Sequence, residues 1–167
     1  MEAVLECFLF VSPDPVTPAQ VAAALDLDER AARDALEGLR ERYASPGLQV
    51  IRIAGGYQLC TRPEHGEFIA RFLRPPVQRL TRPALETLAI VAYRQPITQP
   101  EIEAIRGVNC AGVVKTLCER DLIAEKGRKE TVGRPILYVT TDQFLKHFGL
   151  KDLTELPLLE ESLEKHA

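Results

Sequence analysis

The sequence has few of the residues from which metal and redox sites are built. Only three of its 167 residues are histidine, four are cysteine, and tryptophan is absent. The cysteines form no CxxC pair and have no histidine at ligand spacing: Cys7, Cys60, Cys110 and Cys118. We therefore expect no metal and no cofactor, and free thiols rather than a disulfide framework.

The motifs of common enzyme classes are missing as well. The chain has no GxxxxGKS or GxxxxGKT phosphate loop and no GxSxG nucleophile elbow. Its histidines, His65, His147 and His166, are scattered, without carboxylate or cysteine partners at a useful spacing. We predict that the protein is not an enzyme and has no small-molecule substrate.

Long hydrophobic runs are also lacking. No stretch approaches the ~20 apolar residues that a membrane-spanning helix needs. The N-terminal stretch MEAVLECFLFV carries Glu2 and Glu6 and lacks the basic flank of a secretory signal. We expect a cytoplasmic protein that does not enter a membrane.

No large excess of charge of one sign is present, since the net charge is only −3. Residues 79–150 alone carry 11 basic and 8 acidic side chains, a net charge of +3. The excess is concentrated at Lys126, Arg128, Lys129 and Arg134. This cluster is suited to phosphate or to an acidic partner, although Glu125 and Glu130 favour an ordinary solvated loop. We expect weak or indirect DNA association at most.

The stretch from Leu80 to Asn109 contains the clearest structural signals. Apolar residues at helical spacing predict a core helix over 82–93, with one face formed by Leu85, Leu88, Ala89 and Ala92. Thr98-Gln99-Pro100-Glu101 is a capping box that begins a second helix over 99–105, and Gly107 ends it. Asn109 is predicted to cap a third helix that runs to Arg120.

The same plan occurs earlier in the chain. The stretch from Val4 to Leu25 repeats the pattern of Ala84 to Ile105, including a second capping box at Thr17 to Gln20. Asp28 is predicted to cap a third helix that runs to Tyr43. A strand pair follows each third helix. The predicted strands are Leu48 to Ala54 with Tyr57 to Thr61 around a Gly55-Gly56 turn, and Leu122 to Glu125 with Pro135 to Thr140.

We therefore predict a mainly α fold with small β wings, built as two tandem winged-helix (helix-turn-helix) domains. The N-terminal domain covers residues 1–74 and the C-terminal domain covers residues 80–150. A Pro-rich linker at 75–79 separates the domains, and an acidic tail follows at 151–167.

Two long segments also resemble a known family. TRPALETLAIVAYRQPITQPEIEAIRGVN and ERDLIAEKGRKETVGRPILYVTTDQFLKHFGLKDLTELP are similar to ScpB, the bacterial segregation and condensation protein, although Val139 stands where a glycine is expected. The resemblance implies a non-enzymatic subunit of the condensin-like SMC–kleisin complex, active in chromosome condensation and partition and associated with the nucleoid. It also implies a homodimer that binds the kleisin ScpA and, through it, the SMC head domains.

We assign these contacts to two surfaces. Dimerisation is assigned to the N-terminal domain, at Leu5, Phe8, Leu9 and Val11, because the first helix is apolar around most of its circumference. Kleisin binding is assigned to the C-terminal domain, at Arg106, Val114, Lys115, Cys118 and Arg134. Periodicity leaves open whether Val114 and Cys118 face the domain core instead.

The alternative function is a sequence-specific DNA-binding transcription regulator. In that case a third helix would present Arg, Lys, Asn or Gln to base edges in the major groove. The third helix of the first domain instead alternates acidic and basic residues, as Glu29 with Arg33 and Arg30 with Asp34. This pattern is typical of a solvated face, so we favour a protein-binding module.

Overall fold

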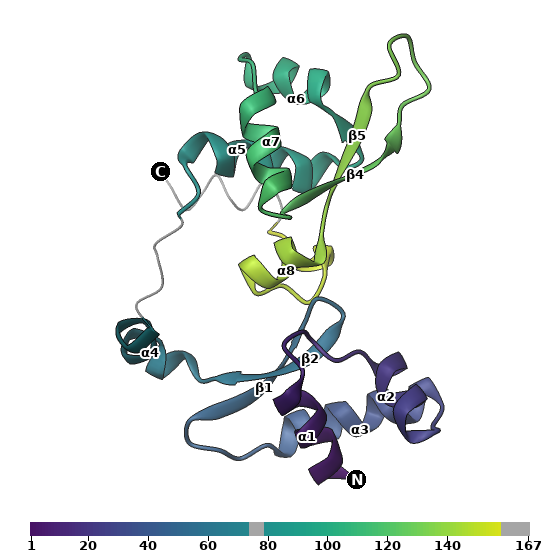
Figure 1. The fold of residues 1–167 in the computed structure, drawn as a ribbon, viewed down its shortest axis with the longest axis vertical. Helices are drawn as coiled ribbons and strands as arrows, with labels where there is room; N and C mark the ends of the chain where they lie inside the picture. Colours follow the sequence, from purple (N-terminus) through teal and green to yellow (C-terminus); the bar gives the residue numbers. More distant parts are fainter. Residues whose placement is uncertain (74–78, 158–167) are drawn as a thin grey trace. The chain divides into compact units, whose positions relative to one another are not determined.

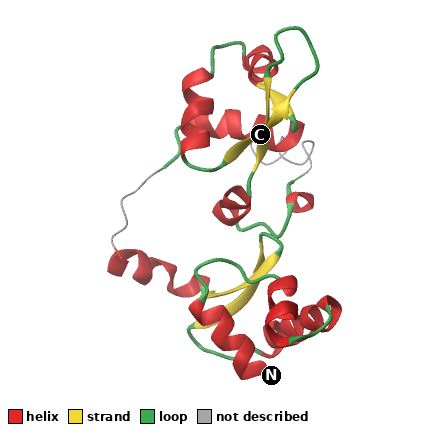
Figure 2. Cartoon of the chain, turned by 45° about the vertical axis from the view of Figure 1, so that its right-hand side comes forward, coloured by secondary structure: helices red, strands yellow, loops and turns green. Residues whose placement is uncertain are grey.

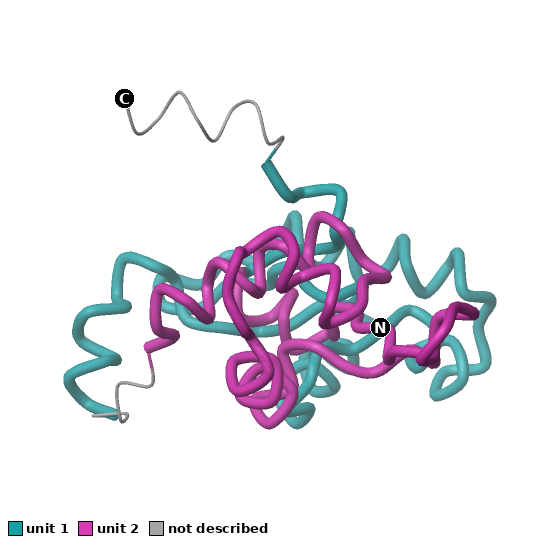
Figure 3. Tube along the Cα trace, turned by 90° about the horizontal axis from the view of Figure 1, so that it is seen from above, with its two compact units in different colours: residues 1–76, 149–167 teal, residues 77–148 magenta. Residues whose placement is uncertain are grey.

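The computed structural model describes residues 1–73 and 79–157, and it is mainly helical with two small sheets, as the sequence predicts (Figures 1 and 2). The chain divides into two compact units (Figure 3). Unit 1 contains Met1–Pro76 and Gly149–Ala167, and unit 2 contains Val77–Phe148. Most of the predicted linker at 75–79 and of the predicted tail at 151–167 lies outside the described residues.

Unit 1 begins with three helices whose ends are set by local sequence. They are α1 (Glu2–Val11), α2 (Pro18–Leu25) and α3 (Glu29–Arg42). The capping box before α2 is confirmed, because the Thr17 amide donates to Gln20 Oε1 at 2.8 Å and the Gln20 amide donates to Thr17 Oγ1 at 3.3 Å. Asp28 caps α3 by accepting the Ala31 amide at 2.9 Å.

An antiparallel hairpin follows α3. It consists of β1 (Leu48–Ile53) and β2 (Gly56–Thr61), paired from Leu48 with Thr61 to Ile53 with Gly56. The predicted turn is wrong by one residue, because Ala54 and Gly55 are the two turn residues and both have positive φ. Gly56 is instead a strand residue whose added Cβ would lie 2.9 Å from the Val16 carbonyl oxygen.

The core of unit 1 lies between α1, α2, α3 and the hairpin. Its buried residues are Leu5, Leu9, Val16, Val21, Ala32, Leu36, Leu39, Val50 and Tyr57. A single turn, η1 (Pro63–His65), then leads into α4 (Gly66–Leu73), which buries none of its residues. The segment after residue 148 returns to this unit, where the Leu150 and Lys151 carbonyls accept the turn amides of the hairpin at 3.1 and 3.0 Å. That segment ends with η2 (Leu153–Glu155).

Unit 2 repeats the order of three helices followed by strands. Its helices are α5 (Arg82–Arg94), α6 (Gln99–Arg106) and α7 (Ala111–Glu119), with a short strand β3 (Ile97–Thr98) before α6. The Thr98 amide and hydroxyl both donate to Glu101 Oε2, at 2.9 and 2.7 Å, and Gly107 ends α6 with φ of 69°. The cap of α7 is Cys110 rather than Asn109, whose side chain accepts the Ala111 amide at 3.2 Å.

A three-stranded sheet and a last helix complete unit 2. The strand order is β3-β5-β4, where β4 is Ile123–Arg128 and β5 is Ile136–Thr140, with an irregularity between Glu125 and Arg128. Helix α8 (Asp142–Phe148) follows. Of the helices in the described ranges, none has the length and apolar content required to cross a bilayer.

The buried face of α5 differs from the predicted one. Leu85 was expected in the core but is 44% exposed, and Ala89 is exposed as well. The core side is formed by Ala84, Thr87, Leu88, Val91 and Ala92. The core side is shifted because Thr87, a polar residue outside the predicted apolar face, is fully buried.

Candidate partner-binding surfaces

Helix α7 does not present the apolar surface that the sequence predicts. Val114 is only 3% exposed and lies in the core of unit 2, so its assignment to a partner-binding surface is wrong. Lys115 is exposed and lies 3.8 Å from Glu119 one turn later on the helix, while Cys118 is half-buried. Burial raises the pKa of the Cys118 thiol. Helix α7 therefore offers a partner the Lys115 ammonium, which is already near Glu119, and little exposed apolar area.

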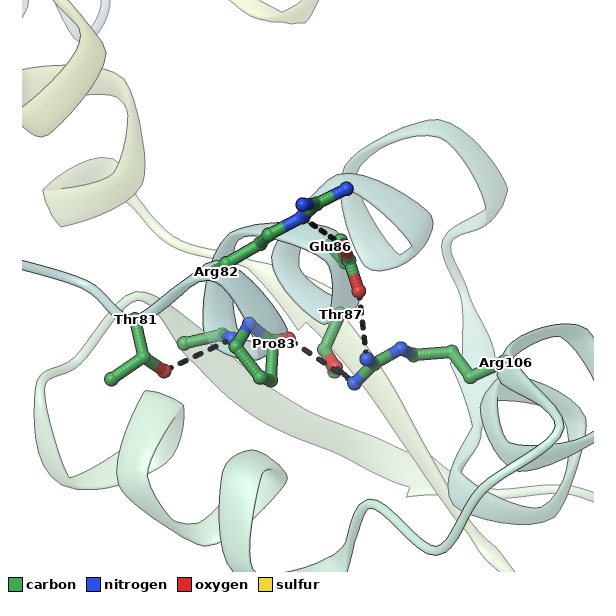
Figure 4. Close-up of polar contacts among 7 residues, drawn as sticks. Thr81, Arg82, Pro83, Glu86, Thr87 and Arg106 are labelled. Atoms are coloured by element: carbon green, nitrogen blue, oxygen red, sulfur yellow. Dashed lines mark hydrogen bonds and ion pairs between the residues drawn. The ribbon is translucent and has the colours of Figure 1, made fainter.

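Arg106 belongs to a polar cluster that joins α6 to α5 (Figure 4). One guanidinium nitrogen donates to Thr87 Oγ1 at 2.8 Å and to the Pro83 carbonyl at 3.2 Å. The other donates to Glu86 Oε2 at 2.8 Å, and the side chain is only 10% exposed. The prediction that Arg106 pairs with a partner is therefore corrected, because three of its five N–H groups donate inside unit 2 and the side chain is largely buried.

The predicted cluster of basic residues lies on β4 and on the loop that leads to β5, and we call it the basic wing: Lys126, Arg128, Lys129 and Arg134. It is partly neutralised within unit 2. Arg128 donates to the Arg134 carbonyl at 3.1 Å, and Lys129 forms an ion pair with Glu101. The Lys129 ammonium, followed by the Thr98 hydroxyl and amide, lowers the pKa of Glu101 to about 2. Arg134 is exposed, as its predicted role requires.

An open groove lies beside α6 in unit 2. It has a volume of about 350 Å³ and we call it the α6 groove: Arg94, Pro96, Ile97, Glu101, Ala104 and Ile105. Ile105 is 56% exposed, and Val108 just beyond the helix is 54% exposed. The sequence did not lead to a prediction of this surface, although Glu101, Ala104 and Ile105 have the spacing of one helix face.

Helix α1 has two apolar sides, and only one of them faces the core. Leu5 and Leu9 are 1% and 3% exposed, so they are core residues and their assignment to a dimer contact is wrong. Phe8 is half-buried against the same core. The other side is exposed, and we call it the α1 face: Val4, Cys7, Phe10 and Val11. Of the four predicted dimerisation residues, only Val11 belongs to this face.

A second exposed apolar surface lies on α4. Phe68, Phe72 and Leu73 are 65%, 83% and 64% exposed, and we call these three residues the α4 face. Glu67 and Arg71 form an ion pair on the other side of the helix. Exposed apolar patches of this kind are typical of protein–protein contacts.

Three of the four arginines on the third helix of unit 1 form ion pairs: Arg33, Arg40 and Arg42. Arg33 donates to Glu29 at 2.9 Å, and Arg40 forms an ion pair with Glu37. Arg40, and then the Tyr57 hydroxyl at 2.8 Å, lower the pKa of Glu37. Carboxylates that stay ionised along α3 repel phosphates, so this helix is poorly suited to a DNA groove.

The described part of the chain contains no group of three His, Cys, Asp or Glu side chains placed to hold a metal ion. All four cysteines are free thiols, and burial raises the pKa of Cys60 and Cys110. A raised pKa keeps these thiols protonated and poorly reactive near neutral pH.

Sequence comparison gives close relatives across nearly the whole chain. Residues 3–159 match the family described as segregation and condensation complex subunit ScpB. The segregation and condensation protein B of Moorella thermoacetica is 54% identical over 96% of this chain and 84% of its own length. That of Symbiobacterium thermophilum is 51% identical over 94% of this chain and 73% of its own length.

Two solved structures are also similar in sequence. ScpB from Mycobacterium tuberculosis is 34% identical, with 89% of this chain and 94% of that chain covered and a TM-score of 0.42. A dimer of the ScpB N-terminal domain complexed with ScpA peptide is 28% identical, with 42% and 91% covered and a TM-score of 0.39. Because both TM-scores are low, the assignment rests on the sequence relatives. The chain belongs to the ScpB family of segregation and condensation complex subunits.

Proposed function

We propose that the protein is a non-enzymatic subunit of a condensin-like SMC–kleisin complex that acts in chromosome condensation and partition at the nucleoid. Membership of the ScpB family carries this proposal. The surfaces of the two units support it, because exposed apolar residues gather on α1, α4 and beside α6. Surfaces of this kind suit protein partners better than a duplex, which requires free donors in a groove.

Each unit is proposed to be a winged-helix domain. In unit 1 three helices precede an antiparallel hairpin, and in unit 2 three helices precede the paired strands β4 and β5. This repeated order supports the proposal. Unit 1 is proposed to form the homodimer and unit 2 to bind the kleisin ScpA, which connects the protein to the SMC head domains.

The proposed kleisin site is the α6 groove, in place of the α7 surface. An amphipathic helix of the partner has apolar side chains at every third or fourth position, and Ile105 and Val108 offer matching apolar area. Arg94 on the rim of the groove is exposed and is suited to a carboxylate beside that apolar stripe. Lys115 and Cys118 on α7 and Arg134 on the wing lie outside the groove lining.

Titration calorimetry with a kleisin fragment tests the site. We expect Ile105→Glu to weaken binding by more than ~2 kcal/mol, as at interface hot spots. The matched control is Lys115→Glu on α7, which should bind as the wild type does. Equal binding by the Ile105 variant would exclude the groove, and loss in the control alone would return the site to α7.

A pull-down tests the proposed function itself. The kleisin should co-purify with the protein from nuclease-treated lysate, because the contact is between proteins. The competing function, a transcription regulator, would instead select one duplex from a random pool with nanomolar affinity. That outcome, together with no kleisin in the pull-down, would overturn the proposal.

A further inference from the structure

The two exposed apolar surfaces of unit 1 lie on two short helices, α1 and α4. At 100° per residue, Val4, Cys7, Phe10 and Val11 occupy an arc of about 120° on α1, opposite the core side, and Cys7 lies at its centre. On α4, Phe68, Phe72 and Leu73 share an arc of about 140°. Arg71 and Glu67 lie on the other side of α4.

These two surfaces do not cover each other within one chain. Phe10 is 76% exposed and Phe72 is 83% exposed, which excludes a mutual contact between them. Figures 1 and 2 both show α4 standing apart from α1 at the far end of β2 within unit 1. In the described residues α4 has its main contacts with η1, the turn directly before it.

We propose that the α4 face of one protomer packs on the α1 face of a second copy, and that this exchange is reciprocal. The inference rests on the proposed homodimer and specifies its contact. If the two protomers are related by a two-fold axis, then packing of α4 of the first protomer on α1 of the second also places α4 of the second on α1 of the first. Both exposed faces of both protomers are then covered at once, which a contact between two α1 helices alone does not achieve.

The available area fits a stable dimer. The three exposed phenylalanines, each about three quarters accessible, contribute about 450 Å² per protomer at about 200 Å² for a whole side chain. Val4, Val11 and Leu73 add about 200 Å². The total of about 1,300 Å² for two protomers lies within the range of about 1,200–2,000 Å² for specific interfaces. Contact through either face alone would bury about half of that area and fall below the range.

Cross-linking of the full-length protein tests the pairing, because Cys7 at the centre of the α1 face is a natural probe. In Phe72→Cys, mild oxidation at a protein concentration high enough to keep the weakened dimer associated should give a covalent dimer in which peptide mapping finds Cys7 joined to position 72. The matched control is Arg71→Cys on the opposite side of α4, which should give no such link. A Cys7–Cys7 link in the wild-type protein, or a link between positions 7 and 72 within one chain, would overturn the proposal.

Sedimentation of Phe72→Ser gives a second readout. Loss of a hot-spot aromatic weakens binding about 30-fold, and the substitution occurs at two symmetric sites, so the dimer dissociation constant should rise about 1,000-fold. Arg71→Ser should leave it unchanged. If the wild type is a dimer and Phe72→Ser dimerises equally well, only this pairing of α4 with α1 is excluded. If the wild type is a monomer at micromolar concentration, the homodimer itself is excluded. Kleisin binding by unit 2 is measured separately and is independent of both outcomes.

Discussion

Replacement of Arg106 by alanine is expected to destabilise unit 2 rather than to remove a partner contact. The guanidinium donates to the buried Thr87 hydroxyl and to the Pro83 carbonyl (Figure 4), and a hydrogen bond from a charged group contributes ~1.5–3 kcal/mol. The ion pair with the partly exposed Glu86 adds ~0–1 kcal/mol. Because two of the three acceptors, the Pro83 carbonyl and the Glu86 carboxylate, are exposed, water partly replaces the lost hydrogen bonds, and we predict a total loss of ~2–4 kcal/mol.

Amide hydrogen exchange measures this loss in the full-length chain. The slowest amides of α5 and α6 should exchange ~30- to 900-fold faster in Arg106→Ala, while those of α3 in unit 1 stay unchanged and serve as the internal reference. Arg82→Ala is the matched control, because Arg82 also donates to Glu86, at 3.0 Å, but its side chain is 91% exposed. We expect less than ~0.5 kcal/mol there. Equal effects of the two substitutions would refute the argument that burial makes Arg106 important.

Three further predictions follow from the same structure. In Lys129→Met the pKa of Glu101 should rise from about 2 toward 4.5 but stay below 4.5, because Thr98 still donates to the carboxylate. A carbon NMR titration of the Glu101 carboxyl measures this pKa. Because folding lowers the pKa of Glu101, the ionised carboxylate stabilises the folded protein fully above about pH 4.5, and this stabilisation is lost as the pH falls toward 2. The free energy of unfolding of Lys129→Met should therefore fall less over this pH range than that of the wild type. Val114→Ala should cost ~2 kcal/mol in chemical unfolding of unit 2, whereas Lys115→Ala should stay within ~0.5 kcal/mol; similar values would place position 114 at the surface. DNA binding by the isolated protein should be weak and insensitive to sequence, with a slope of log K against log salt of about −4 or shallower in filter-binding assays, and a steeper slope would indicate a larger cationic surface than the basic wing.

The incorrect assignments have one physical origin. Periodicity places Leu85, Val114 and Leu5 on apolar helix faces, but it does not determine which apolar face of a helix packs against the core of its unit. On α5 the apolar arc is so wide that the core side shifts by one residue, and Thr87 becomes buried because Arg106 satisfies its hydroxyl. Arg106 is distant from Thr87 in sequence, so no local pattern could have predicted this contact.

Local sequence determined the helix ends and the strand pairs, because capping boxes, a cap aspartate and positive-φ glycines act within a few residues of one another. Thr17, Asp28, Thr98 and Gly107 all have their predicted roles. The two-fold repeat and the mainly helical fold with small sheets follow from these signals. Tertiary packing alone decided which apolar residues remain at the surface. The α1 face and the α6 groove exist because each core is filled by other side chains, and that depends on contacts between elements far apart in the sequence.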